Sequence, residues 1–373
     1  MRRSYRTLSA LLAALLCAAP ALAADSAAPT AAPIPTALTA SAAQGGALHL
    51  DLSRDLAGFT PLLADYPQGE EAFYELDVSR QPIPIAGAGF GLRLTGNNHS
   101  DDLFLGACRL LEGLPPETPC VFTVTLRIAT NVDGGLVGIG GSPGSSVFFK
   151  CGITAAEPRR EVVDGYYRLT LDKGNQGQDG PDMALIGNLE KDDAKAPGQY
   201  EWKTLTCRLS AAPDALGRAY LSFGIDSDFE GLSRYYVESI DVSWGIAQPL
   251  TRAAAIQALW EVKGRPAGEA PPFPDAADTP VLAWARSQGI TLGYADGSFR
   301  PEEALSFQQA LLLLYRAAGS PEVYWAPALP GLAPQAESAA AWALDQGLFR
   351  LRELSAPAAP IPEAVFRQTL PGA

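Results

Sequence analysis

Short runs of alternating apolar and polar residues fill the chain between residues 47 and 246. Clear examples are residues 90–95 (FGLRLT), 121–128 (VFTVTLRI) and 235–242 (YYVESIDV). A period of two, with Gly, Asn, Asp and Pro between the runs, predicts antiparallel strands that bury one face each. No long helical pattern interrupts these runs. We therefore expect residues 47–246 to fold as an all-β sandwich, for which about 200 residues is an ordinary size.

From residue 249 onward the apolar residues follow the period of helices instead. The residues that share one predicted helix face are Phe307, Ala310, Leu311, Leu314, Tyr315 and Ala318. Their spacing of three or four residues is that of an amphipathic α-helix. The chain is thus expected to be multidomain, with an N-terminal all-β sandwich followed by an all-α region over residues 249–373.

The helical region also repeats itself. Residues 250–260 align with residues 305–315, and residues 283–290 align with residues 341–348. Residues 361–366 (IPEAVF) are a third, weaker copy of the first segment. Self-similarity of this kind is typical of arrays in which small units share one core.

The first residues carry the three parts of a secretory signal peptide. Arg2, Arg3 and Arg6 form a basic start, residues 8–19 are apolar, and residues 21–23 (ALA) provide a cleavage site. The apolar run is shorter than the roughly 20 residues that a membrane span needs. We therefore predict that residues 1–23 are a signal peptide and that the mature protein is secreted, without a transmembrane helix.

The segment that follows, residues 24–46, is rich in Ala, Pro and Thr and has no hydrophobic period. Such a composition cannot bury a core, so we expect a disordered linker.

Charge and cysteine content narrow the range of partners. The formal net charge is −13, from 28 basic and 41 acidic residues, which argues against nucleic acid and against an anionic membrane surface. The cysteines beyond the predicted signal peptide are Cys108, Cys120, Cys151 and Cys207. Three pairings of these four are possible, and buried thiols are the alternative to any disulfide.

A dense motif lies in the centre of the helical region. It consists of residues 273–275 (FPD), Trp284, residues 289–290 (GI) and residues 293–301 (GYADGSFRP). This succession resembles a unit of the S-layer homology (SLH) family, and the resemblance extends over residues 249–373, with a degenerate last unit. The aromatic residues of the motif are expected to pack between helices, because apolar residues at helical spacing are usually buried.

The SLH resemblance implies a helical repeat domain that binds secondary cell-wall polysaccharide in grooves between three units. In that family a Thr-Arg pair contacts an anionic sugar substituent, and the planar guanidinium suits a carboxylate. Only Thr251-Arg252 retains the pair, since the other two units have Ser306-Phe307 and Pro362-Glu363. A purely structural role of the repeats is the alternative. The candidate glycan-binding residues are Thr251, Arg252, Trp284, Gly293 and Asp296.

The β-region has a looser resemblance of its own. Residues 114–126 and 235–244 are similar to the entry segment and the final strand of carbohydrate-binding jelly rolls. This resemblance implies a jelly-roll-like sandwich, but folds of this kind host many functions.

One loop of the β-region, residues 95–102, places two amides, an imidazole and two carboxylates between apolar strands. Such oxygens suit a polar ligand or Ca²⁺, and turn formation by Asn and Asp is the alternative. The candidate residues are Asn97, Asn98, His99, Asp101 and Asp102. Apart from a possible Ca²⁺ we expect no cofactor. Residues 172–182 and 226–230 form further polar, acidic loops.

These features predict an exported cell-surface protein that associates with the cell wall through SLH-like repeats and presents a glycan-binding or other ligand-binding sandwich. The alternative is a structural or interaction protein without sugar affinity. We do not expect an enzyme, because the chain has only two histidines, His49 and His99, and they do not form a zinc-type pair. A glycoside hydrolase with a carboxylate pair is the less favoured possibility.

Overall fold

The structure, a computed structural model, describes residues 45–373 except 101, 193–195, 350, 355 and 371–373. The predicted signal peptide, nearly all of the predicted linker, and Asp101 lie outside the described residues.

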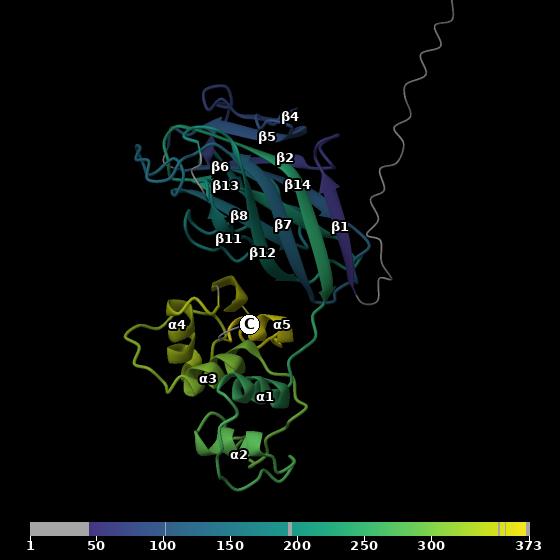
Figure 1. Ribbon diagram of the computed structural model, residues 1–373, viewed down its shortest axis with the longest axis vertical. Coiled ribbons are helices and arrows are strands. Elements are labelled where there is room, and N and C mark those ends of the chain that lie inside the picture. The colour runs from purple at the N-terminus through teal and green to yellow at the C-terminus, as the bar shows by residue number, and fades with distance from the viewer. Residues whose placement is uncertain (1–44, 101, 193–195, 350, 355, 371–373) are drawn as a thin grey trace, which may run out of the picture. The chain divides into compact units, whose positions relative to one another are not determined.

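Two antiparallel sheets form a sandwich (Figure 1). The strands of the six-stranded sheet, in spatial order, are β12 (Glu201–Ala211), β7 (Cys120–Thr130), β14 (Leu232–Ile246), β5 (Phe90–Asn97) and β4 (Asp77–Pro82), with β1 (Gly45–Asp51) also pairing with β14. Those of the five-stranded sheet are β11 (Ala184–Asn188), β8 (Val147–Thr154), β13 (Ala219–Ser227), β6 (Leu103–Leu111) and β2 (Thr60–Ala64). A third, small sheet contains β3 (Tyr66–Pro67), β10 (Tyr166–Leu169) and β9 (Arg160–Val163).

The alternation along each strand determines which side chains enter the core. On β7, Phe122, Val124, Leu126 and Ile128 are fully buried, whereas the residues between them are partly or fully exposed. The buried sides of the two larger sheets share one apolar core, and the Tyr235 hydroxyl of one sheet donates a hydrogen bond to the Leu105 carbonyl of the other at 2.9 Å. This alternation is the pattern seen in the sequence, and the predicted β-sandwich is confirmed.

The four cysteines of the sandwich, Cys108, Cys120, Cys151 and Cys207, are buried thiols. Burial raises the pKa of Cys120 to about 11, which keeps its thiol protonated and unreactive at neutral pH. Of the two possibilities left open by the sequence, the structure therefore shows the thiols.

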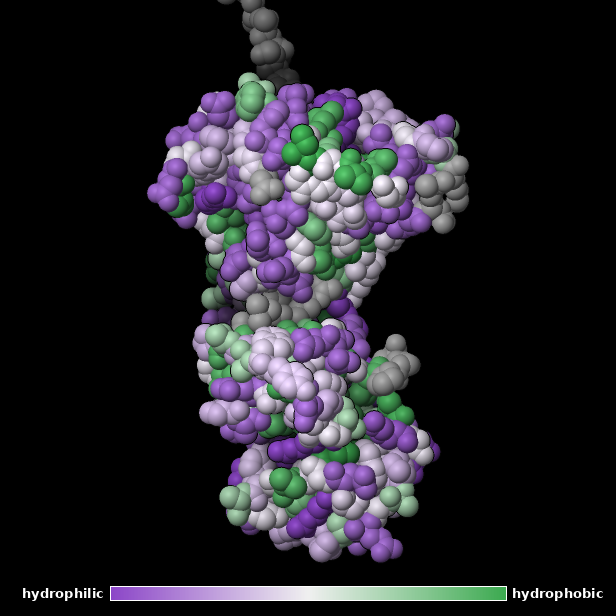
Figure 2. Space-filling view, turned by 90° about the vertical axis from the view of Figure 1, so that its left-hand side faces the viewer, coloured by the Kyte–Doolittle hydropathy of each residue, from purple (hydrophilic) through white to green (hydrophobic). Residues whose placement is uncertain are grey.

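The outer surface of the sandwich is mostly polar. Figure 2 shows one face of the molecule, on which hydrophilic residues predominate over the sandwich and hydrophobic residues form separate patches. The most exposed large apolar side chains of the sandwich, Val137, Ile139, Leu216 and Phe73, all lie in loops between strands.

The C-terminal region is helical but small. Its helices are α1 (Arg252–Val262), α2 (Pro280–Ser287), α3 (Phe307–Ala317), α4 (Glu337–Asp345) and α5 (Glu363–Gln368), with short 3₁₀ turns at Pro334–Ala336 and Leu351–Leu354. Proline-containing segments separate them, because proline cannot continue a helix. The described residues therefore show five short helices with long connections, a more modest structure than the expected all-α repeat domain.

The segments that enter α1, α3 and α5 are joined by a closed ring of backbone hydrogen bonds. The Leu250 N–H donates to the Ile361 carbonyl at 2.9 Å, the Ile361 N–H to Leu305 at 2.8 Å, and the Leu305 N–H to Leu250 at 2.7 Å. All three side chains are buried in the helical core. We call this arrangement the three-residue ring. It links three segments that lie far apart in the sequence.

Within the described residues, we find no helix with the length and apolar character required to cross a membrane.

Candidate functional site

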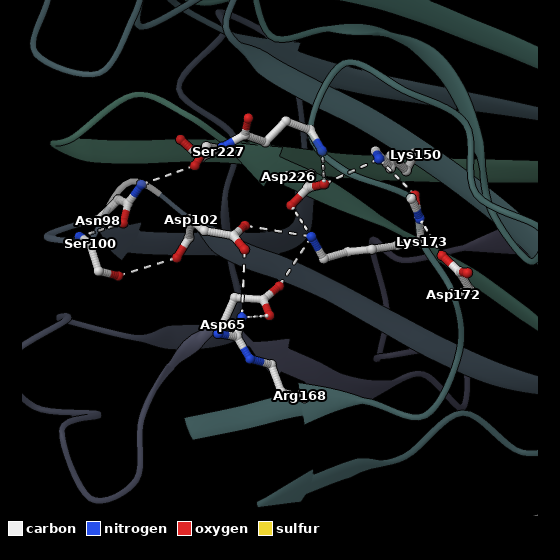
Figure 3. Close-up of polar contacts among 12 residues, drawn as sticks. Asp65, Asn98, Ser100, Asp102, Lys150, Arg168, Asp172, Lys173, Asp226 and Ser227 are labelled. Atoms are coloured by element: carbon white, nitrogen blue, oxygen red, sulfur yellow. Dashed lines mark hydrogen bonds and ion pairs between the residues drawn. The ribbon is translucent and has the colours of Figure 1, made fainter. Parts of the chain in front are cut away.

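Six charged side chains of the sandwich form a partly buried group (Figure 3), which we call the charged cluster. Its members are Asp65 at the end of β2, Asp102 before β6, Lys150 on β8, Arg168 on β10, Lys173 in the loop after β10, and Asp226 on β13. Three carboxylates thus face three cations, so their formal charges compensate. Buried charges need such partners, because removing them from water is costly.

Lys173 lies at the centre of the charged cluster (Figure 3). Its Nζ is 2.6 Å from Asp226 Oδ1, 3.2 Å from Asp65 Oδ2 and 3.5 Å from Asp102 Oδ1. Burial lowers the pKa of Lys173, but the three carboxylates outweigh that effect and raise the pKa above its ordinary value. The ammonium group therefore stays charged at neutral pH.

Two further cations complete the charged cluster. Lys150 Nζ is 3.1 Å from Asp226 Oδ2, and both side chains are fully buried. The same Nζ donates hydrogen bonds to the carbonyls of Lys173 and Gln178 at 2.7 and 2.8 Å, which fixes the loop that carries Lys173. Arg168 Nη1 is 2.6 Å from Asp65 Oδ1.

The three carboxylates have the spacing of a cation site. Oxygens of Asp65, Asp102 and Asp226 lie within 4.8 Å of one another, as ligands of one divalent cation would. The ammonium group of Lys173 lies among these oxygens, so Ca²⁺ could bind there only by displacing it. The sequence pointed to Asp102 as a ligand and flagged the loops that contain Lys173 and Asp226, but Asp65 was not recognised.

Asp102 has an altered acidity. Burial raises its pKa from 3.8 to about 7; Lys173 opposes this shift, and the neighbouring Asp65 and Asp226 add to it. Asp102 is the most exposed of the three carboxylates and makes the longest contact with Lys173. With this raised pKa, Asp102 takes up a proton as the pH falls below about 7.

The Asp102→Asn variant is expected to change how stability depends on pH. Because the folded-state pKa is raised, the folded protein binds more protons than the unfolded chain between about pH 4 and 7. Its stability should therefore fall as the pH rises through this window. Between pH 5 and pH 8 the free energy of unfolding should fall by at least about 1 kcal/mol less in the variant than in the wild type. Urea unfolding at the two pH values measures this difference. Asp164→Asn, at an exposed turn, is the control, and identical pH dependence in wild type and Asp102→Asn would contradict the assignment.

The other predicted residues of this loop bond locally. Asn98 is buried, and its Nδ2 donates to the carbonyls of Ser227 and Phe229 at 3.0 and 3.1 Å. Asn97 Nδ2 donates to Glu75 Oε1 at 2.9 Å. His99 stacks on the exposed ring of Phe73, with 4.2 Å between ring centroids. The structure thus brings Asp102 into the charged cluster, whereas Asn97, Asn98 and His99 are held by other partners.

A second group of side chains lies on the outer face of the six-stranded sheet. We call it the outer-face site, and its members are Arg93, Arg127, Tyr200, Trp202, Arg234 and Tyr236. The strand register aligns Trp202 with Ala129, Ala129 with Tyr236, and Tyr236 with Arg93. Because alternate residues of a strand point to the same side, Arg127 and Arg234 share this face.

The aromatic side chains of the outer-face site lie close together. The rings of Tyr200 and Tyr236 are 5.4 Å apart, and Trp202 packs against the same small apolar cluster as Tyr236. The guanidinium of Arg127 lies 3.9 Å from the centroid of the Trp202 ring, and it also pairs with Glu238. Trp202 and Tyr200 remain partly exposed. The result is an aromatic surface bordered by cations.

Hydroxyl groups continue this face along the strands. The Oγ1 atoms of Thr125 and Thr206 are 3.1 Å apart, and both residues are at least partly exposed. Thr204, between Trp202 and Thr206 on the same side of β12, is exposed as well. A surface of this kind offers both ring stacking and hydrogen bonds to a polar ligand.

In the helical region the predicted Thr251-Arg252 pair has structural contacts. The Thr251 side chain caps α1 by accepting from the Ala254 N–H at 3.2 Å. Arg252 is 7% exposed, and its Nε donates to the Phe299 carbonyl at 2.8 Å. Its guanidinium lies over the ring of Tyr294. These contacts account for the conformation of both residues, and a role in reading a sugar stays a prediction.

The remaining motif residues shape the same unit. Trp284 and Phe299 belong to the buried helical core, as predicted for the aromatic residues. Gly293 has a φ of +75°, and a Cβ there would lie 2.7 Å from the Phe273 ring, so only glycine fits. Asp296 accepts from the Ser298 N–H at 2.9 Å and pairs with Arg300. Asp296 is thus on the surface, and its binding role also stays a prediction.

A groove of the helical region lies between α1, α3, α4 and α5. Its volume is about 440 Å³, and its polar lining includes Lys263, Gln346 and Thr369 beside Trp342. None of these residues was singled out as a ligand contact from the sequence, although Trp342 and Gln346 lie in the repeated segment 341–348.

Comparison with known proteins identifies part of the helical region. Residues 272–311 match the S-layer homology domain, so the predicted resemblance is confirmed for the central motif. No curated protein matches the chain.

Solved carbohydrate-binding sandwiches are similar to about half of the chain. The CBM22-1 xylan-binding domain from Paenibacillus barcinonensis Xyn10C is 11% identical, with 56% of this chain and 100% of that domain covered and a TM-score of 0.30. CBM27-1 from Caldicellulosiruptor saccharolyticus, solved with mannohexaose, is 10% identical, with 52% and 96% covered and a TM-score of 0.29. A third structure, from work on carbohydrate-binding modules of the β-sandwich superfamily, is 13% identical. The match covers 50% of this chain and only 56% of that one, with a TM-score of 0.26.

Proposed function

We propose that this chain is an exported surface protein, attached to the cell wall through its SLH-like helical region and binding a glycan on the outer face of its sandwich. The match of residues 272–311 to the SLH domain supports wall association. The groove beside Lys263 and Trp342 offers a place for a wall polysaccharide, and the three-residue ring supports a three-unit arrangement. Binding, rather than catalysis, is the role assigned to both regions.

The observation that carries glycan binding is the outer-face site. A sugar ring has apolar faces bordered by hydroxyl groups, so it suits an aromatic surface with hydrogen-bonding groups beside it. Trp202 supplies the aromatic surface, and Arg127 and Thr204 lie next to it in the strand register. The ring is held by its packing and needs little ordering when a ligand binds, which favours affinity.

Trp202→Ala tests this proposal. Loss of a central aromatic contact in a binding site commonly removes more than about 1.4 kcal/mol, and we therefore expect the affinity to fall by roughly tenfold or more. The measurement is affinity electrophoresis of the full mature chain in gels that contain soluble polysaccharides, with thermal unfolding to verify the fold.

Trp325→Ala is the matched control, because Trp325 is a partly exposed tryptophan of the helical region. It should migrate like the wild type. If no polysaccharide retards the wild type, or if Trp202→Ala is retarded to the same degree, the sandwich does not bind glycans through this face. The alternative of a purely structural surface protein would then be favoured.

A further inference from the structure

We infer that the outer-face site selects acidic polysaccharides, with Arg234 as the residue that receives a sugar carboxylate. This inference rests on the proposed glycan binding and adds the chemical class of the ligand. It is carried by the charges, the buried donors and the hydrogen-bonding chemistry of the outer-face site.

The charge of the outer-face site differs from that of the chain. The chain has a formal net charge of −13, yet three arginines converge here. Arg93 pairs with Asp77 at 2.7 Å, and Arg127 pairs with Glu238. Among the described residues, Arg234 has no carboxylate within ion-pair distance. One positive charge of the outer-face site is therefore available to a ligand.

Arg234 also has a buried donor whose loss of contact with water is not offset by a hydrogen bond. The Nε atoms of Arg93 and Arg234 are buried and have no hydrogen-bond acceptor. A desolvated donor without a partner costs about 1–3 kcal/mol. Burial also raises the pKa of the adjacent Tyr200, and the charge of Arg234 opposes that shift. An anion beside Arg234 would neutralise the guanidinium and offset part of the cost.

Hydrogen-bonding chemistry points to a carboxylate in particular. A guanidinium has five N–H donors and no acceptor, so three of them give the outer-face site an excess of donors. A neutral sugar hydroxyl is both donor and acceptor and leaves part of this excess unused. A carboxylate offers two acceptor oxygens in the planar geometry that a guanidinium fork matches. Trp202 lies on the same face of the sheet, on β12, with β7 between it and β14, the strand of Arg234.

The experiment compares two forms of one polymer with the full mature chain. Polygalacturonate carries a carboxylate on each ring, and its methyl ester has the same backbone without that charge. The wild type should bind polygalacturonate about tenfold more tightly than the ester, measured by affinity electrophoresis. Arg234→Gln should lower the affinity for polygalacturonate to about that for the ester and so remove this preference. Arg208→Gln is the charge-matched control on the same sheet face, and it should retain the preference.

Each other outcome has a definite meaning. Equal binding of both polymers by the wild type would overturn the acidic specificity and leave the proposed glycan binding intact. Loss of the preference in Arg208→Gln to the same extent would also overturn it, because the effect would then be one of general charge. So would equal binding of dextran sulfate, which has no carboxylate. Binding of neither polymer, nor of any other glycan, would instead overturn the proposed function itself.

Discussion

Replacing Lys173 with alanine is expected to destabilise the sandwich by about 3–5 kcal/mol and to create a binding site for Ca²⁺ in the charged cluster. The ammonium group contacts the carboxylates of Asp65, Asp102 and Asp226. Without it, three buried carboxylates face only Lys150 and Arg168. Urea unfolding measures the loss of stability.

The ion-binding part of this prediction has a matched pair of variants. Lys173→Ala leaves space between the three carboxylates, whereas Lys173→Met removes the charge but keeps most of the side chain's volume. Ca²⁺ should raise the melting temperature of the alanine variant and leave the methionine variant unchanged. The wild type should melt at the same temperature with Ca²⁺ and with a chelator, because Lys173 provides the positive charge.

A second buried lysine serves as a control for the loss of charge alone. Lys191 lies 2.6 Å from Asp133 and 3.2 Å from Glu201, outside the charged cluster. Lys191→Ala should be destabilised without any response to Ca²⁺. If the melting temperature of Lys173→Ala does not respond to Ca²⁺ either, the three carboxylates do not act as a cation site, and the hypothesis of Ca²⁺ binding at Asp102 fails with it.

The second large effect is expected at the three-residue ring. Ile361→Ala should destabilise the helical region by about 2–5 kcal/mol, because the fully buried side chain leaves a cavity where three segments meet. Circular dichroism at 222 nm during thermal unfolding follows this region, since the helices lie outside the sandwich. Sedimentation with purified cell walls should decrease near the temperature at which the helices unfold, whereas glycan binding by the sandwich should persist.

Val262→Ala is the control for this variant. Val262 also lies in the helical region, but its side chain is 42% exposed, so its truncation should change the stability by no more than about 0.5 kcal/mol. Equal stability of Ile361→Ala and Val262→Ala would show that the third, degenerate segment is not part of the helical core. Unchanged wall sedimentation of an unfolded helical region would show that attachment depends on another part of the chain.

The sandwich could be predicted from the sequence because the alternation of apolar and polar residues lies within each single strand. Alternation along 121–128 specifies which side chains are buried without any knowledge of the neighbouring strands. The same alternation places Trp202 on the outer face of β12 beside Thr204 and Arg208, so one member of the outer-face site was within reach of the sequence. The pairing of β12, β7, β14 and β5 is not local, and it is what brings Tyr236 and Arg93 beside Trp202.

The charged cluster could not be derived from the sequence for the same reason. Asp65, Asp102 and Asp226 belong to separate segments that meet only through the pairing of β2, β6 and β13. One signal was available, because Lys150 interrupts an otherwise apolar strand (VFFKCGI). A lysine in a buried strand requires a carboxylate partner, but nothing in the sequence identifies which one.

The SLH motif was recognised in the sequence, but the contacts that its residues make became known only from the structure. Its aspartate at position 275 accepts hydrogen bonds from the N–H groups of Phe299 and Arg300, both at 2.8 Å. These bonds close the unit around Gly293, and Arg252 is anchored to the Phe299 carbonyl. Much of the motif thus maintains the fold of one unit. The pattern alone does not distinguish such residues from those that touch a ligand.

The three-residue ring also bears on how this chain tolerates mutation over generations. Its hydrogen bonds use only main-chain atoms, so apolar side chains of similar volume can replace one another at these positions without loss of the bonds. Residues 361–366 share little of the repeat pattern, yet the backbone of Ile361 still completes the ring. A closed cycle of three, however, has no free end. A tandem duplication that added a fourth segment, or a deletion that removed one, would break the closed ring of hydrogen bonds. The number of segments is therefore constrained more tightly than the amino-acid sequence of each segment.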